Sequence, residues 1–95
     1  MRLRWLRSGS ASLRRQVDFI ASKNPAAARM VRHRIRSTVL RLLDFPQSGR
    51  TGQVPGTREL VVANLPYIVV YRVSGDAVEI LRVFHTSQEP ESFFH

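Results

Sequence analysis

The sequence predicts an α+β fold with the element order β-α-α-β-β-β, in which a helical hairpin packs on one face of an antiparallel sheet. Two observations support this prediction. Helix-like and strand-like periodicities are segregated along the chain instead of alternating, which is typical of α+β domains. The chain has 95 residues, of which 43% are hydrophobic, and this is enough for one core but not for two. We therefore expect a single domain that spans residues 1–95.

The N-terminal half is predicted to form a strand followed by two helices. Residues 2–6 alternate between basic and apolar side chains, as a half-buried strand does. Residues 11–22 have apolar side chains at helical spacing. Asn24 and Pro25 suit the N-cap and the first position of a second helix, which is expected to continue to about Asp44. Its predicted buried stripe consists of Ala28, Val31, Ile35, Thr38, Val39 and Leu42.

The C-terminal half is predicted to form a loop and three strands. Residues 45–57 contain two prolines and three glycines and are expected to be a loop. Strands are expected at residues 58–63, 67–73 and 78–85, with a hairpin turn at "SGDA" between the last two. Strict alternation in the last strand would place one set of side chains, Val78, Ile80, Arg82 and Phe84, opposite another, Glu79, Leu81, Val83 and His85. The sheet face without helices is expected to be open to water or to a partner.

Charge is the strongest signal in the composition. The chain has 15 basic residues, 14 of them arginine, against 7 acidic residues, which gives a net charge of +8. Residues 1–50 hold twelve basic and two acidic residues, whereas residues 51–95 hold three basic and five acidic residues. An N-terminal half this basic is expected to attract a polyanion or an acidic protein. The alternative is a solvated basic surface that serves solubility alone.

Polar side chains in the predicted strands are the candidates for chemistry: Arg58, Arg72, Arg82 and His85, together with Glu59 and Glu79. A histidine, a glutamate and two or three arginines could cleave a phosphodiester without a metal, by acid–base catalysis and charge stabilisation. The alternative is that the charged residues face solvent and that the histidine is structural. The three histidines lack ligand spacing on a shared element, and the loop glycines lack the ending of a phosphate-binding loop. We therefore expect neither a metal nor a cofactor.

Four segments in this order and spacing resemble the RelE/ParE superfamily of type II toxins, and they are closer to ParE than to RelE. These segments are "NPAAA", "FPQSGRTGQVPGTREL", "PYIVVYRV" and "VEILRVFH". The resemblance covers nearly the whole chain. It implies a small toxin that an acidic cognate antitoxin wraps and silences. ParE-like members block DNA gyrase by trapping it on cleaved DNA, whereas RelE-like members cut mRNA in the ribosomal A site.

The resemblance implies a ParE-like toxin of a type II toxin-antitoxin (plasmid stabilisation) system that inhibits DNA gyrase. The alternative is a ribosome-dependent mRNA endoribonuclease of RelE type, in which Arg58, Arg82 and His85 would be catalytic. Those nucleases often have a tyrosine just after the histidine, and "HTSQEPESFFH" has none, which favours an inhibitor that is not an enzyme. A third interpretation is a binding module that is no longer toxic.

The expected partners are the antitoxin and DNA gyrase, or the ribosome and mRNA in the alternative. Residues predicted to bind antitoxin or target are Arg29, Arg32, Arg36, Arg58, Arg72 and Arg82. The first three share the outer face of the second predicted helix. No apolar run is long enough to cross a bilayer, so we expect a cytoplasmic protein without a membrane partner. A homodimer or a toxin-antitoxin heterotetramer is compatible with these expectations.

Overall fold

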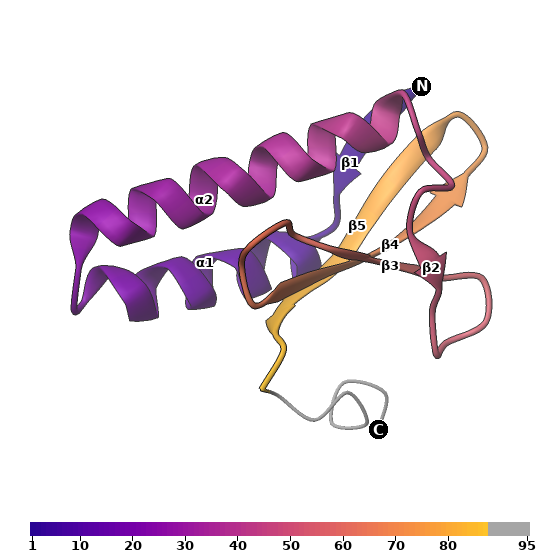
Figure 1. The fold of residues 1–95 in the computed structure, drawn as a ribbon. Coiled ribbons are helices and arrows are strands. Elements are labelled where there is room, and N and C mark those ends of the chain that lie inside the picture. Colours follow the sequence, from indigo (N-terminus) through magenta and orange to yellow (C-terminus); the bar gives the residue numbers. More distant parts are fainter. Residues whose placement is uncertain (88–95) are drawn as a thin grey trace.

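The computed structural model describes residues 1–87 and confirms the predicted α+β fold (Figure 1). Two helices lie side by side over one face of a five-stranded sheet, and the end of the hairpin formed by residues 22–24 projects beyond the sheet. The elements are β1 (Arg2–Trp5), α1 (Arg7–Ala21), α2 (Pro25–Leu40), the 3₁₀ helix η1 (Arg41–Leu43), β2 (Arg50–Thr51), β3 (Arg58–Val61), β4 (Tyr67–Ser74) and β5 (Ala77–His85).

The sheet differs from the prediction in two details. Its strand order is β1-β5-β4-β3-β2, and β1 pairs with β5 in parallel, with Leu3 opposite Val78. The other three pairings are antiparallel, as predicted. The second difference is β2, a two-residue strand within the predicted loop. Neither detail has a local sequence signal. The partner of β1 lies about 75 residues away along the chain. Strand β2 has only two residues, too few to show the alternation that identifies a strand.

The second helix begins where the sequence predicts. The side chain of Asn24 accepts a hydrogen bond from the backbone N–H of Ala27 at 3.1 Å, and Pro25 is the first helical residue. The α-helix ends at Leu40, earlier than expected, and continues as the 3₁₀ turn of η1. Helix α1 begins at Arg7, four residues before its predicted start at residue 11.

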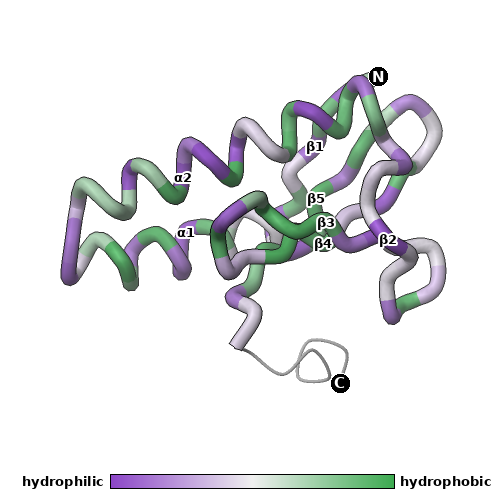
Figure 2. Tube along the Cα trace, viewed as in Figure 1, coloured by the Kyte–Doolittle hydropathy of each residue, from purple (hydrophilic) through white to green (hydrophobic). Residues whose placement is uncertain are grey.

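The core lies between the helical hairpin and the sheet, where Figure 2 shows hydrophobic segments of both layers facing each other. Five of the six predicted α2 residues are buried: Ala28, Val31, Ile35, Val39 and Leu42. Thr38 is only half-buried, and its hydroxyl donates to the carbonyl of Arg34 at 2.8 Å. Each fully buried aliphatic side chain contributes about 1.5–3 kcal/mol to folding, so this stripe is a major part of the force that holds the hairpin on the sheet.

A β-bulge in β5 changes which side chains face the helices. Val70 is opposite Arg82, but the next residue, Tyr71, is opposite Ile80, so Leu81 is an extra residue in β5. The alternation of sides therefore shifts by one residue beyond the bulge. Val83 then joins Ile80 in the core beneath the helices. The strict alternation predicted for this strand was wrong, because a bulge depends on strand pairing and leaves no mark in the period of a single strand.

The N-terminus of α1 binds directly to this bulge. The hydroxyl of Ser8 donates to the carbonyl of Leu81 at 2.7 Å. The hydroxyl of Ser12, which is only 1% exposed, accepts a hydrogen bond from the N–H of Val83 at 2.8 Å and donates to the carbonyl of Gly9 at 2.9 Å. These two serines thus satisfy backbone groups that the bulge removes from the ladder.

Gly9 allows the close contact between α1 and β5. A Cβ atom at this position would lie 2.3 Å from the carbonyl oxygen of Ile80, which is backbone and cannot move aside easily. Any larger residue would therefore push the first turn of α1 away from β5. Glycine is a poor helix former, but this contact explains why Gly9 lies in the first turn of α1.

We predict that Ser12→Ala lowers the free energy of unfolding by about 1–3 kcal/mol, because it leaves the buried N–H of Val83 without a partner. Urea unfolding followed by circular dichroism measures this change. The matched control is Ser37→Ala, which removes an exposed hydroxyl from α2. Equal midpoints for Ser12→Ala and the unchanged chain would contradict the role assigned to this serine.

Candidate functional site

The sequence-predicted residues Arg58, Arg82 and His85 lie on two different faces of the sheet. Residues directly opposite each other on paired strands share a face. Arg58 is opposite Tyr71 on the side of the helices, and Arg82 is opposite Val70 on the other side, here called the second face. His85, opposite a core tyrosine, also lies on the helix side. The structure thus does not gather these three residues on one surface.

Arg58 holds the loop that precedes it. One of its terminal nitrogens, Nη1, donates to the carbonyl of Gly49 at 2.8 Å and to that of Gln47 at 3.4 Å. The buried Tyr71 binds the same loop, because its hydroxyl donates to the carbonyl of Pro46 at 2.8 Å and accepts from the N–H of Gly49 at 2.9 Å. This guanidinium therefore has two backbone carbonyls as partners. Tyr71 is buried in the core, and its hydroxyl also fixes the loop, a contact that the sequence does not indicate.

His85 is half-buried at the end of β5. Its ring meets the ring of Tyr67 edge to face, with centroids 5.3 Å apart and an interplanar angle of 84°. Its Nδ1 accepts a hydrogen bond from the backbone N–H of Ser87 at 3.0 Å and lies 2.7 Å from the hydroxyl of that serine. A neutral ring with these contacts has its proton on Nε2. Burial also raises the pKa of the Tyr67 hydroxyl.

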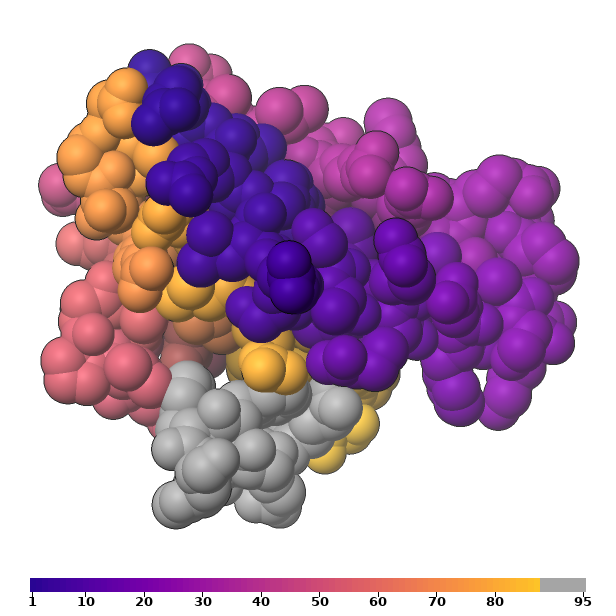
Figure 3. All heavy atoms as spheres, turned by 180° about the vertical axis from the view of Figure 1, so that it is seen from behind, coloured from indigo at the N-terminus to yellow at the C-terminus, as the bar shows by residue number. Residues whose placement is uncertain are grey.

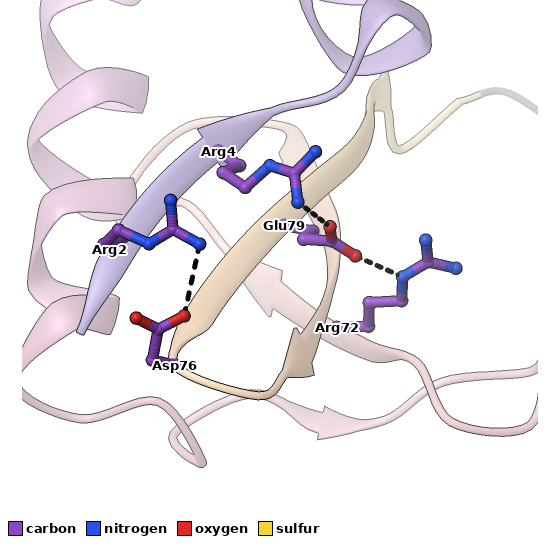
Figure 4. A network of polar contacts seen from close by, with 5 residues as sticks. All are labelled: Arg2, Arg4, Arg72, Asp76 and Glu79. Carbon is purple, nitrogen blue, oxygen red and sulfur yellow. Dashed lines mark hydrogen bonds and ion pairs between the residues drawn. The ribbon is translucent and has the colours of Figure 1, made fainter.

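The second face has an ion-pair network around a buried glutamate (Figure 4). Glu79 accepts a hydrogen bond from Nε of Arg72 at 2.7 Å and lies 3.2 Å from Nη1 of Arg4. The hydrogen bond from Arg72 lowers the pKa of the Glu79 carboxyl below its usual value of 4.5, against the opposing effect of desolvation. These contacts join β1, β5 and β4, and they give Arg72 a structural partner.

Glu59 forms a second pair on the same face. Its side chain is 7% exposed and accepts hydrogen bonds from Arg50 at 3.0 and 3.2 Å. The N–H of Gln53 lies 3.4 Å from the other carboxylate oxygen. This pair fixes the short strand β2 against β3. Both buried glutamates thus have arginine partners, as buried carboxylates require.

An apolar cluster occupies the remaining part of the second face. Ile68, Val70 and Phe84 are each less than 8% exposed, and Leu81 packs against them. We expected this face to be open, and for this cluster the expectation was wrong. The bulge places Phe84 and Leu81 on the same side as Ile68 and Val70, and the four side chains pack against one another.

A groove of about 460 Å³ lies between the two helices, on the side where β1 meets α1. Figure 3 shows this side of the molecule, with β1 and the start of α1 in indigo. Apolar side chains in the lining are Trp5, Leu13 and Val17, and polar or charged ones are Ser10, Arg14, Asp18, Arg32 and Arg36. No ion pair within residues 1–87 involves any of the groove arginines. The groove therefore combines apolar contact area with an excess of positive charge, three arginines against one aspartate.

The groove includes two of the predicted binding residues, Arg32 and Arg36, which come from α2. Arg29 is exposed on the same helix one turn earlier. Arg14 and Trp5 line the groove from other elements and were not predicted, because only the packing of α1 against α2 brings them together. Among residues 1–87, no group of histidine, aspartate and glutamate side chains could hold a metal ion, and no described helix is long and apolar enough to span a membrane.

The fold is that of the RelE/ParE superfamily. A chain from the structure entitled "Chromosomal ParDE TA system from P. aeruginosa" superimposes with a TM-score of 0.81 at 30% identity, over 90% of this chain and 95% of that chain. Residues 3–90 match the family described as "ParE toxin of type II toxin-antitoxin system, parDE". The chain therefore belongs to the ParE toxin family.

Two relatives agree with this assignment. Y4kP of Sinorhizobium fredii is 43% identical over 88 residues, which cover 93% of this chain and 91% of that protein. Toxin RelE2 of Caulobacter vibrioides is 31% identical over 84 residues, which cover 88% of this chain and 93% of that protein. The similarity therefore extends over nearly the full length of each of these proteins.

We predict that the chain loses stability in acid through Glu79. Because Arg72 lowers the pKa of Glu79 in the folded chain, the unfolded chain takes up the proton first as the pH falls. The contribution is fully present above pH 4.5, the usual value for glutamate, and is lost as the pH falls through the lower folded value. Urea midpoints at pH 7 and pH 3 measure this loss.

Glu79→Gln should be less stable at pH 7 and should show a smaller decrease between these pH values. The control is Asp18→Asn, which removes an exposed carboxylate that forms no ion pair within residues 1–87. The assignment would be contradicted if Glu79→Gln and the unchanged chain lost stability equally in acid.

Proposed function

We propose that this chain is the toxin of a type II toxin-antitoxin pair, that it inhibits DNA gyrase, and that an acidic cognate antitoxin neutralises it. Membership of the ParE family is the observation on which this proposal rests. The toxin would act in the cytoplasm, and the pair would stabilise the plasmid or chromosomal region that encodes it. The complex could be a heterotetramer, in which each toxin binds one antitoxin.

The positions of the strand residues support inhibition through a surface rather than catalysis. A metal-free nuclease needs its acid, its base and its cations around one phosphate. Here Arg58 and Arg82 lie on different faces, and Arg58 is hydrogen-bonded to loop carbonyls. His85 uses Nδ1 to accept hydrogen bonds from Ser87. These contacts favour structural roles for Arg58 and His85.

The groove between the helices is the site that we propose for the antitoxin. Its apolar side chains would bury the apolar face of an amphipathic segment, and Arg14, Arg32 and Arg36 would bind carboxylates on the flanks of that segment. Charge attraction of this kind mainly accelerates association and excludes wrong partners. Arg29, one turn from the groove, would extend the attraction along α2.

The second candidate function is a ribosome-dependent endoribonuclease. The observation that favours it is the number of arginines on the second face, namely Arg4, Arg50, Arg72 and Arg82. Three of these arginines are paired with buried glutamates. Such pairing reduces the charge available to an RNA phosphate, so we rank this candidate second.

We predict that expression of the toxin alone produces broken DNA and filamentous cells, and that the purified chain inhibits supercoiling by DNA gyrase. His85→Ala should leave this inhibition within about twofold of the unchanged chain, because the proposed mechanism requires no acid–base step. Gel assays of plasmid supercoiling measure it. If the variant instead lost its toxicity and the unchanged chain cut messages inside codons, the nuclease would be the correct function.

We also predict that the double variant Arg32→Glu, Arg36→Glu binds the antitoxin encoded beside it at least tenfold more weakly, because repulsion replaces attraction at the groove. Biolayer interferometry measures the affinity and shows whether the loss is mainly in the association rate. The control is Arg41→Glu, which changes an exposed charge outside this groove. Equal losses in the control and in the double variant would contradict the proposed docking site.

A further inference from the structure

The helical hairpin, residues 7–40, carries nearly all of the net charge of the chain. These residues include eight basic residues and one acidic residue, a net of +7, whereas the rest of the sequence holds seven basic and six acidic residues. The four ion pairs found within residues 1–87 lie on the strands or in the turn between β4 and β5. Four arginines of the sheet, Arg2, Arg4, Arg50 and Arg72, thus have carboxylate partners, whereas none of these pairs involves an arginine of the helices.

The charges of the hairpin extend beyond the groove. Arg14, Arg32 and Arg36 line it, but Arg7, Arg15, Lys23 and Arg29 are also exposed on the hairpin and are not in its lining. A peptide lying in the groove would reach only the first three. A long polyanion would interact with all of them, because charge neutralisation over an extended surface does not require a fitted pocket.

The spacing on α2 suits the backbone of duplex DNA. Arg29, Arg32 and Arg36 follow one face of the helix over about 10 Å of its axis, and a duplex presents roughly six phosphate charges over that length. Single strands are a poorer match, because their binding uses exposed aromatic rings among the basic residues. The exposed phenylalanines within residues 1–87 are Phe19 and Phe45, and only Phe19 lies on the hairpin. The ammonium of Lys23 already lies over this ring, 4.6 Å from its centroid, and one such ring is less than the series of rings on which successive bases stack.

We propose that the helical hairpin binds the phosphate backbone of duplex DNA without sequence preference, through Arg29, Arg32 and Arg36 of α2 and Arg14 of α1. The choice of DNA over other polyanions rests on the proposed inhibition of gyrase, an enzyme that holds a DNA duplex. Because the groove arginines would serve both DNA and antitoxin, the two ligands exclude each other. The antitoxin thus neutralises the toxin partly by occupying its DNA-binding face.

The test is fluorescence anisotropy of the full chain with a labelled 20-base-pair duplex, measured over a range of salt concentrations. We expect a dissociation constant of roughly 1–100 μM, weakening steeply with salt. Arg29→Gln, Arg32→Gln and Arg36→Gln should each weaken binding and lower the salt slope by about 1, the value for one lost phosphate contact. All three keep a good helix former in α2.

The matched control is Arg2→Gln, which removes the same charge from β1, where an exposed pair with Asp76 contributes little to stability. An unchanged salt slope for Arg2→Gln supports the proposal. Equal losses in all four variants would show that net charge alone attracts DNA, and would overturn it. Tighter binding of a single-stranded DNA or RNA of the same length would also overturn it.

Two further measurements test the shared face and distinguish a failure of this inference from a failure of the proposed function. Prior saturation with antitoxin should abolish DNA binding, and undiminished binding by the complex would refute the shared face. A chain that inhibits gyrase but does not bind DNA alone would overturn the inference and leave the function intact. A chain that binds DNA through these arginines but does not inhibit gyrase would refute the function and support the inference.

Discussion

The bulge at Leu81 and its contacts with α1 are the constraint on which the arrangement of this molecule depends. One extra residue in β5 reverses the sides of the strand beyond it, so Val83 enters the core and Phe84 enters the cluster on the second face. Ser8 and Ser12 stabilise this irregularity through hydrogen bonds from the first two turns of α1. The position of the helical hairpin and the two faces of the sheet are therefore set by the same few contacts.

Electrostatics follows the same division between layers. On the sheet, arginines support structure, because Glu59 and Glu79 are buried and each needs a cationic partner. On the hairpin, most arginines are exposed, and three of them line a groove that also has apolar side chains. A buried ion pair adds little binding capacity, whereas an exposed group of like charges raises the local concentration of an anionic ligand. The structure thus distinguishes paired arginines on the sheet from exposed arginines on the hairpin, which the sequence alone does not.

Features set by local chemistry were predictable from the sequence. Asn24 and Pro25 mark the start of α2 because capping involves only neighbouring residues, and the apolar stripe of α2 follows from helical periodicity. The parallel pairing of β1 with β5 and the bulge were not predictable, because both depend on contacts between distant segments. The candidate site divides in the same way: Arg32 and Arg36 were expected on an outer helix face, but Arg14 and Trp5 reach the groove only through tertiary packing.

The concentration of charge on the hairpin gives the molecule a permanent electrical asymmetry. Its longest dimension is 39 Å, and the hairpin projects past the sheet at one end. In the field of an anionic target, this asymmetry produces a torque that turns the hairpin toward the target at distances within about one Debye length, roughly 8 Å in physiological salt. Orientation of the hairpin toward such a target therefore begins before contact.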